Sequence, residues 1–275
     1  MRPAVIVFGS VSYRYRDDAP PALADATFSL EPGELVAVVG ANGSGKSTLA
    51  RLCDGLLLPN EGSVTVDGLD TSDPEALPRV RALVGMVFQD PDDQIVGTVV
   101  EEDCAFGPEN LGVPRDEIRR RVDDALAAVG LSGMERREPH LLSEGQKQRL
   151  AVAGALALRP RYLVLDEATA MLDPAGRRAV LSIAERLARN DGHGVLVVSH
   201  DLAAAARADR VLGLVSGRVV FDGTPTDLLT RSEMLDALGL ALTPVARLAA
   251  SLRERGADVP VTALDAESVV AALWP

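Results

Sequence analysis

A glycine-rich stretch, Gly40–Ser47, has the spacing of a loop that holds phosphate groups, because its letters GANGSGKS match G-x-x-x-x-G-K-S/T. Glycines in such a loop let backbone N–H groups converge on phosphate oxygens, and a helix that begins there adds positive potential. Lys46 would reach the β- and γ-phosphates, and the Ser47 hydroxyl would bind Mg²⁺. A chance match is the weaker alternative, because the apolar run Leu35–Val39 precedes the loop and a helical pattern follows it. The predicted nucleotide-binding residues of the loop are Gly40, Asn42, Gly43, Ser44, Gly45, Lys46, Ser47 and Thr48.

A second apolar run, Tyr162–Leu165, ends in two consecutive acids, Asp166 and Glu167. Buried carboxylates at the end of a strand are costly unless they hold a cation or take part in chemistry. We therefore expect Asp166 to hold Mg²⁺ through water, and Glu167 to accept a proton from an attacking water as general base. Taken alone, the pattern also fits an ordinary strand end; the phosphate loop in the same chain favours the catalytic interpretation.

A third motif, Leu142–Arg149, places Ser143 and Gly145 at the start of a predicted helix. Taken alone, Ser143 is a helix N-cap. A helix that begins with serine and glycine is also an anion site. If it served the same nucleotide as Gly40–Ser47 it would be redundant, so we expect it to face a nucleotide held by a second subunit.

The elements that must position these motifs alternate between apolar strands and helices, which predicts an α/β fold with a largely parallel sheet covered by helices on both faces. Thr98 and Glu101 have the spacing of a capping box. The predicted strands are Val5–Tyr15, Thr27–Leu30, Leu35–Val39, Gly62–Asp67, Val84–Phe88, Tyr162–Leu165, Val195–Val198, Val211–Val215 and Arg218–Phe221. The predicted helices cover about Lys46–Leu56, a segment opened by Pro114, Ser143 to about Leu158, Pro174–Arg189, Thr243–Gly256 and Asp265–Leu273.

The composition excludes several classes of protein. The 275 residues include 28 Lys and Arg against 40 Asp and Glu, a net charge of −12, so nucleic-acid binding through a basic face is not expected. The two cysteines fit a reducing compartment, and the three histidines form no zinc-ligand pattern. The first residues, MRPAVIVFGS, lack a convincing signal peptide, and no apolar run is long enough to span a membrane. We expect a protein that is neither exported nor membrane-spanning by itself.

The order of the motifs resembles that of the ATP-binding-cassette (ABC) family, over roughly Val5–Gly223. Six elements occur in the family's order over about 160 residues: the phosphate loop, Gln89 after a strand, LSEGQ, LVLDE, Leu172-Asp173-Pro174 and Ser199-His200-Asp201. The resemblance implies ATP as the bound nucleotide and a dimer that sandwiches two ATP molecules. It also implies a phosphate-loop (RecA-like) core with an antiparallel β subdomain and a helical subdomain.

The resemblance also implies roles for residues outside the phosphate loop. Tyr15, which lies 25 residues before Gly40, would stack on adenine, although an aromatic residue on a strand is commonly part of the core. Gln89 would contact Mg²⁺ and the attacking water and report occupancy to a membrane partner. His200 would contact the γ-phosphate; the alternative is a histidine with a structural role.

The same resemblance assigns four residues to the dimer. Ser143, Gly145 and Gln146 would bind the ATP of the opposite subunit, and Asp173 would link the two sites across the interface. The chain also departs from the family's pattern: Glu144 replaces the usual glycine of the LSEGQ motif, and Ala168 and Met171 replace a proline and a glycine. Because Ser143 and Gly145 would make the phosphate contacts, we expect ATP binding to survive, with a weaker attraction for ATP caused by the carboxylate at position 144.

A finer resemblance connects Phe88–Gly112, Asp166–Pro174 and the tail Leu238–Pro260 with the energy-coupling-factor ATPases. It implies a transmembrane scaffold that docks near Gln89–Asn110 and a small membrane subunit that binds the cargo. It also implies a C-terminal extension that contributes to ATPase pairing. The docking segment has seven acids and no Lys or Arg, which fits either a groove for a basic helix, with Asp92 and Asp93 as the best candidates, or a solvated acidic face.

The sequence therefore predicts an ABC nucleotide-binding domain over residues 1–223, with a helical subdomain at about 90–158, and a C-terminal helical extension over 224–275. We expect an ATPase that drives an energy-coupling-factor importer of a vitamin or transition-metal ion from the cytoplasmic face of the cell membrane. A conventional ABC importer or exporter, or a soluble ABC protein that acts on ribosomes or DNA, is the alternative. Pairing with itself and pairing with a related ATPase both stay open.

Overall fold

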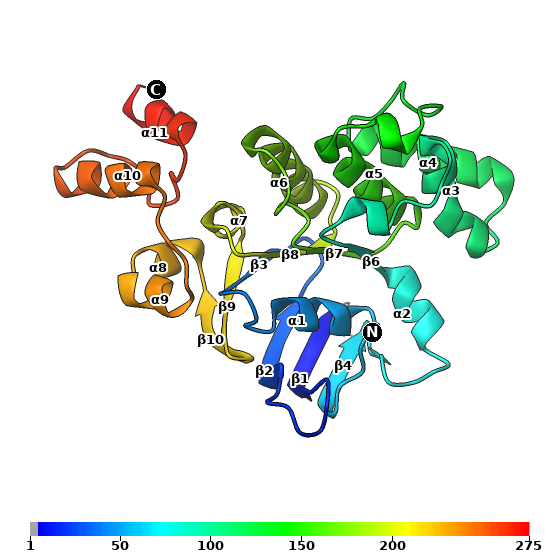
Figure 1. The fold of residues 1–275 in the computed structure, drawn as a ribbon, viewed down its shortest axis with the longest axis horizontal. Helices are drawn as coiled ribbons and strands as arrows, with labels where there is room; N and C mark the ends of the chain where they lie inside the picture. Colours follow the sequence, from blue (N-terminus) through cyan, green and yellow to red (C-terminus); the bar gives the residue numbers. More distant parts are fainter. Residues whose placement is uncertain (1–4, 275) are drawn as a thin grey trace.

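The computed structural model describes residues 5–274 and is built around a six-stranded sheet with the order β10-β9-β3-β8-β7-β6 (Figure 1). Met1–Ala4 and Pro275 belong to the predicted ranges but lie outside the described residues. Five strands are parallel, and β10 is antiparallel to β9. The strands are β3 (Leu35–Val39), β6 (Val84–Val87), β7 (Tyr162–Asp166), β8 (Gly194–Ser199), β9 (Arg210–Val215) and β10 (Arg218–Gly223).

The central strand β3 is buried along its whole length, as its unbroken apolar run predicts. Successive side chains of a strand point to opposite faces of the sheet. Val36 and Val38 accordingly join one hydrophobic core, and Ala37 and Val39 join the other. The sheet is therefore covered on both faces, which confirms the α/β prediction.

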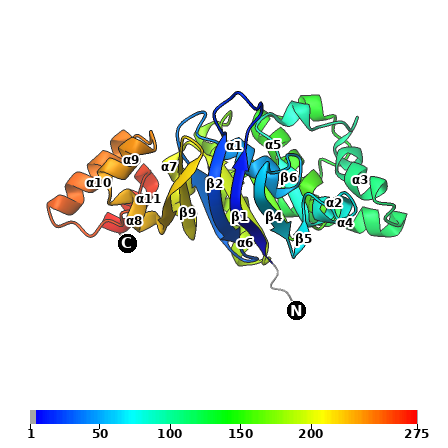
Figure 2. The same ribbon diagram turned by 90° about the horizontal axis from the view of Figure 1, so that it is seen from below.

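The first of these cores is closed by a second, antiparallel sheet with the order β2-β1-β4-β5 and by α1 (Lys46–Cys53). Figure 2 shows this sheet in front of the molecule, with helices at both ends. The rings of Phe8 and Phe28 stack across the β1–β2 pair with centroids 4.4 Å apart. The strands of this sheet are β1 (Ile6–Tyr13), β2 (Leu23–Leu30), β4 (Glu61–Val66) and β5 (Leu69–Asp70).

The second core lies between the main sheet and α3 to α7, whereas Val80 of α2 joins the first core; α3, α4 and α5 form a group at one end of the molecule (Figure 1). The predicted bounds of α6 are those observed, whereas α2 and α7 were not predicted. The helices and short 3₁₀ turns are α2 (Leu77–Leu83), η1 (Pro91–Asp93), α3 (Val100–Asn110), α4 (Arg115–Ala128), η2 (Pro139–Leu141), α5 (Glu144–Ala157), α6 (Pro174–Arg189) and α7 (Leu202–Arg207).

The predicted capping box at Thr98 and Glu101 is wrong. The N-cap of α3 is Val99, and the Thr98 hydroxyl donates to Glu102 at 2.5 Å instead. The free N–H groups of the first turn are satisfied by distant carbonyls, because Val100 N–H donates to the carbonyl of Arg137 at 3.0 Å. A tertiary contact has replaced the local cap.

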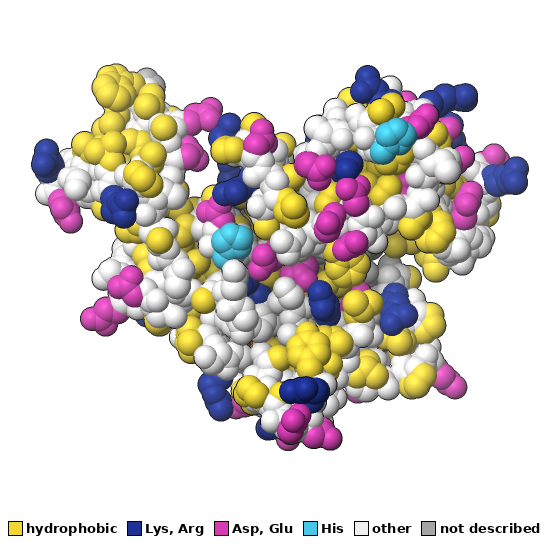
Figure 3. Space-filling view, viewed as in Figure 1, with side chains coloured by type: hydrophobic (Ala, Val, Ile, Leu, Met, Phe, Trp, Pro, Cys, Tyr) yellow, Lys and Arg dark blue, Asp and Glu magenta, His cyan; other side chains and the backbone are white. Residues whose placement is uncertain are grey.

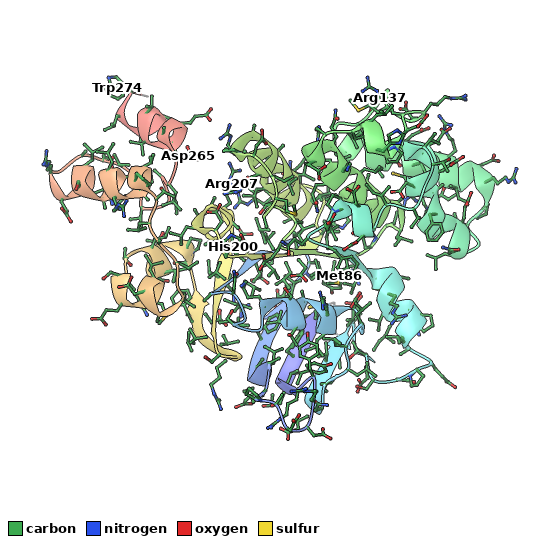
Figure 4. All side chains as sticks on the ribbon, in the orientation of Figure 1. Met86, Arg137, His200, Arg207, Asp265 and Trp274 are labelled. Carbon is green, nitrogen blue, oxygen red and sulfur yellow. The ribbon has the colours of Figure 1, made fainter. Side chains whose placement is uncertain are left out.

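The C-terminal segment consists of α8 (Pro225–Leu229), α9 (Ser232–Ala237), α10 (Pro244–Glu254) and α11 (Ala266–Leu273). Leucines of α8 and α9 join the second core, whereas α10 and α11 pack around a small cluster of their own. Asp265 at the start of α11 and Arg207 of α7 line one cavity of about 290 Å³ (Figure 4). Hydrophobic packing therefore sets α10 and α11 together apart from the second core. The predicted domain boundary at residue 223 stays a prediction.

Hydrophobic side chains gather over α10 and α11 on the face drawn in Figure 3. Leu248, Val270 and Trp274 of this region are more than half exposed. Within residues 5–274, none of the helices combines the length and the apolar character that a membrane crossing requires.

Candidate functional site

The predicted catalytic residues meet at one edge of the main sheet. Strands β3, β6, β7 and β8 are parallel neighbours, so their carboxyl ends lie at the same edge. The phosphate loop follows β3, Gln89 follows β6, Glu167 follows β7 and His200 follows β8. In open α/β sheets, ligands bind in the crevice outside the carboxyl ends of the strands.

The phosphate loop needs its glycines for steric reasons. Gly45, directly before α1, has φ +105°, and a Cβ there would lie 2.2 Å from the carbonyl oxygen of Ala22. Gly43 has φ +78°, in the region that favours glycine. The loop is thereby held against the chain that follows β1, with its N–H groups at the start of a helix, as the motif predicts.

Three charged or ionisable side chains lie next to one another at this edge: Lys46, Glu167 and His200. The buried Lys46 ammonium donates to the carbonyls of Gly40 and Ala41, both at 3.0 Å, and lies 3.6 Å from Glu167 Oε1. Glu167 Oε2 lies 3.6 Å from Nδ1 of His200, which is near the centre of the molecule beside α7 (Figure 4). A carboxylate in this place can accept a proton while a cation and an imidazole hold it in position.

The backbone of Glu167 adds a sign of function. Its φ is +51°, a conformation that a residue with a side chain rarely adopts, and its N–H donates to the Val198 carbonyl at 3.1 Å. Strain of this kind persists only where the surrounding structure imposes it, and it is concentrated at active sites. The strained turn aims Glu167 out of the sheet edge, whereas Asp166 stays within β7.

Asp166 meets the requirements of a cation-binding carboxylate. It is 4% exposed, and its Oδ1 is buried without a hydrogen-bond partner among the described residues. Burial raises the pKa of Asp166, while the hydrogen bond from Ser47 and the charge of Arg51 lower it. An unpaired buried carboxylate oxygen beside a serine hydroxyl fits the oxygen ligands that Mg²⁺ prefers.

The phosphate loop opens into a cavity of about 450 Å³. Tyr15 stands at its rim, more than half exposed, with its hydroxyl sharing a hydrogen bond of 3.2 Å with Thr48. The ring of Tyr13 packs against Tyr15 edge-on and is itself half-buried. The face of Tyr15 is thus available for stacking. The cavity, which we call the nucleotide pocket, is lined by Tyr15, Ala22, Asn42, Gly43, Gly45, Lys46, Ser47, Thr48, Gln89 and Glu167.

A separate cavity of about 570 Å³ lies at the start of α5 and α6. Ser143 caps α5, with its hydroxyl accepting from Gln146 N–H at 3.3 Å, which confirms the predicted N-cap; the structure completes it as a capping box with Gln146. Asp173 caps α6 and accepts from Gly176 N–H at 2.7 Å. We call this cavity the signature pocket; it is lined by Ser143, Glu144, Gly145, Arg149, Met171, Leu172, Asp173, Ala175, Gly176 and Ala179.

The predicted site residues thus fall into two groups that this chain does not bring together. Ser143, Gly145 and Asp173 lie in the signature pocket, and the phosphate loop lies in the nucleotide pocket. Gln146 lines neither pocket, because its amide oxygen accepts from Ser143 N–H and its amide nitrogen donates to Met134 sulfur. Its contact with ATP stays a prediction.

Two members of the site, Arg51 and Ala22, were not predicted from the sequence. Arg51 Nε lies 4.0 Å from Asp166, and one turn of α1 separates it from Ser47, a spacing that could have drawn attention to it. Ala22 lines the nucleotide pocket and carries no signal in the sequence, because a small apolar residue has no chemistry of its own.

The acidic segment after Gln89 is largely paired within the chain. Asp92 forms an ion pair with Lys147 at 2.8 Å, and Glu101 forms one with Arg119 at 3.2 Å. Asp103 is buried and accepts from the N–H groups of two loop residues. Within residues 5–274, the side chain of Asp93 has no hydrogen bond or ion pair, so it remains the acid best placed to meet a partner.

Comparison with known proteins agrees with this geometry. The ABC transporter family matches residues 23–170. The chain is 51% identical to the energy-coupling factor transporter ATP-binding protein EcfA1 of Symbiobacterium thermophilum, over 98% of this chain and 96% of that protein. Among solved structures it resembles cbiO1 of Clostridium perfringens, part of the ABC transporter complex cbiONQ, with a TM-score of 0.77, 34% identity and coverage of 88% and 97% of the two chains.

A second solved structure bears on assembly. The dimeric structure of MJ0796, a bacterial ABC transporter cassette, matches with a TM-score of 0.72 and 29% identity, over 80% of this chain and 98% of that one. These similarities agree with the order of the motifs in the sequence and with the site at the edge of the main sheet. The chain belongs to the ABC transporter family and, within it, to the ATP-binding proteins of energy-coupling factor transporters.

Proposed function

We propose that this chain binds and hydrolyses ATP to drive an energy-coupling-factor importer of a vitamin or transition-metal ion. The observation that supports this most strongly is the meeting of Lys46, Asp166 and Glu167 beside one phosphate loop, in a chain 51% identical to an EcfA1 protein. Fold resemblance alone would not distinguish this importer from other ABC transporters, because a bacterial Atm1-family exporter matches with a TM-score of 0.70.

In the proposed reaction, a water oxygen forms a bond to the γ-phosphorus and the bond from that phosphorus to the β–γ bridging oxygen breaks, giving ADP and phosphate. Glu167 accepts the proton of the water, since its carboxylate is held between Lys46 and His200. Lys46 and the loop N–H groups neutralise charge on the phosphate oxygens. Tyr15 stacks on the adenine ring, and Asn42 and Ser44 shape the loop.

The residues around Asp166 would hold Mg²⁺ in this site. Bound there, the ion would neutralise charge on the β- and γ-phosphate oxygens. Ser47 would supply a hydroxyl ligand, Asp166 a carboxylate through water, and Gln89 an amide oxygen. The unpaired Oδ1 of Asp166 supports this assignment, because a buried carboxylate oxygen without a partner is costly.

The signature pocket would bind the ATP of a second ATPase subunit, through Ser143, Gly145 and Gln146, with Asp173 at the interface. The signature pocket is separate from the nucleotide pocket, which supports the proposal that the two pockets bind different ATP molecules. Packing within the chain does not require the glycine: a Cβ at position 145 would meet only the Cα of Gly176, at 3.7 Å. A ligand that approaches the backbone from outside would require it.

We propose that the acidic segment Gln89–Asn110 docks a transmembrane scaffold at the cytoplasmic face of the membrane, and that a small membrane subunit binds the cargo. Phe106 of this segment is 52% exposed, Val96 is 60% exposed, and the unpaired Asp93 lies three residues before Val96 in the sequence. Exposed apolar residues in an acidic segment fit an amphipathic basic helix of a partner.

Reversing the acids that follow Gln89 tests the docking surface. Changing Asp92 and Asp93 to Arg is expected to abolish copurification with the scaffold, because like charges in an interface repel. The single variant Asp93→Arg separates docking from the Asp92–Lys147 ion pair. Asp116→Arg in the first turn of α4 is the matched control. If the double variant and Asp93→Arg both copurify with the scaffold as the wild type does, this docking surface is rejected.

The proposed function as a whole is tested by a mild-detergent pull-down of the tagged chain from native membranes, with mass-spectrometric identification of its partners. We expect a multi-span scaffold, an ATPase subunit and a small membrane protein that binds the cargo. Recovery of ribosomal or DNA-repair proteins without a membrane partner would contradict the transport function and leave the ATPase chemistry intact.

A further inference from the structure

Glu144 puts a negative charge into the signature pocket. It lies in the first turn of α5, between Ser143 and Gly145, and its side chain is 54% exposed. A carboxylate in this place opposes the positive potential of the helix N-terminus and repels phosphate groups. A pocket that is to receive ATP needs this charge to be compensated.

Lys147, one of only two lysines in the chain, lies one turn further along α5 and supplies the compensation. Its ammonium is 3.1 Å from Glu144 Oε1 and 2.8 Å from Asp92 Oδ2 of η1. The Lys147 side chain is 12% exposed, although Asp92 is 61% exposed. The hydrogen bonds to Asp92 and Glu144 raise the pKa of Lys147, so the ammonium stays charged.

The two carboxylates share one cation, so each is only partly compensated. Asp92 belongs to the turn that follows Gln89, in the segment that would meet the membrane scaffold. Glu144 belongs to the pocket that would meet the ATP of the second subunit. A basic group that binds Asp92 from outside therefore frees Lys147 to pair with Glu144 alone.

We propose that Lys147 is a positioning residue that neutralises Glu144 beside the incoming ATP, and that Asp92 sets how much of this charge is available. Docking of a basic segment on Asp92 would shift Lys147 towards Glu144 and strengthen the attraction of the signature pocket for phosphate. This inference rests on the proposed function and adds an electrostatic link between the docking surface and the nucleotide.

The test measures steady-state ATP hydrolysis, as a function of ATP concentration, by the chain copurified with its ATPase and membrane partners. Lys147→Met is expected to raise KM for ATP about three- to tenfold, with a smaller change in kcat, because Glu144 is left uncompensated. Adding Glu144→Gln in the same chain should return KM to within about twofold of wild type. The rise in KM should shrink at high salt.

Arg120→Met is the matched control, because it removes an exposed cation that pairs with Glu117 on α4 and lines neither pocket. It should leave KM unchanged. If the double variant is as impaired as Lys147→Met, or if the defect does not depend on salt, Lys147 acts through packing and the proposal fails. A normal KM in Lys147→Met also overturns it.

Asp92→Asn tests whether Asp92 competes with Glu144 for Lys147. The variant is measured in the pair of ATPase subunits prepared without the scaffold. Releasing Lys147 to Glu144 is expected to lower KM for ATP about two- to threefold. An unchanged KM would overturn the link to docking. Failure of the proposed function looks different, because the wild-type complex would then show no ATP hydrolysis at all.

Discussion

Replacing Glu167 with glutamine is expected to lower kcat for ATP hydrolysis by about 10²- to 10⁴-fold and to leave ATP bound between closed subunits. The amide has the shape of the carboxylate, so the turn at φ +51° and the neighbours at 3.6 Å are preserved. It cannot accept a proton from the attacking water. Loss of hydrolysis with retained binding would therefore assign the proton transfer to Glu167.

The measurement combines single-turnover hydrolysis, retention of labelled ATP on a filter, and light scattering to follow the dimer. Glu75→Gln, at an exposed position outside the pockets, is the control for loss of one carboxylate. Rapid turnover by Glu167→Gln would remove Glu167 from the role of general base. Loss of ATP binding would instead make Glu167 part of the binding site.

Replacing Lys46 with alanine is expected to lower kcat/KM for ATP by at least about 10²-fold, because one preorganised cation at the phosphates is removed. Lys46 is 3% exposed and lies at the start of α1, and among the described residues it is the only Lys or Arg that lines the nucleotide pocket. Lys46→Arg should not rescue activity, since a planar guanidinium does not fit a buried site shaped for a compact ammonium.

Binding of a fluorescent ATP analogue distinguishes lost affinity from lost catalysis in these variants. Removing Lys46 also takes the nearest cation away from Glu167, so thermal unfolding must be measured alongside binding. A variant that unfolds near the wild-type temperature but does not bind or hydrolyse ATP supports the assignment. A folded and fully active Lys46→Ala would reject the phosphate loop.

The two lysines of the chain each lie close to one of the two pockets. Lys46 places a positive charge in the nucleotide pocket, and Lys147 forms an ion pair with Glu144 of the signature pocket. Local positive charge favours the binding of ATP, itself an anion, to a chain with a net charge of −12. Both lysines of the chain thus stand beside a carboxylate close to a pocket proposed to face ATP.

The sequence by itself determined the local elements of the site. Leu35–Val39 is predicted and observed as a buried strand, and Pro174–Arg189 as a helix, since apolar periodicity and helix caps act over a few residues. The phosphate loop and the N-cap at Ser143 are local in the same sense. Helix α7 was missed because its run of alanines after Asp201 lacks an amphipathic pattern.

Only the tertiary structure decided which local elements meet. The strand order β6-β7-β8-β3 brings Gln89, Glu167 and His200 to the phosphate loop, and this order depends on crossovers that no local pattern specifies. The same holds for the ion pair between Asp92 and Lys147, which lie 55 residues apart in the chain. Long-range packing also separated the two pockets, because α5 and α6 pack in the second core and α1 in the first, on opposite faces of the main sheet.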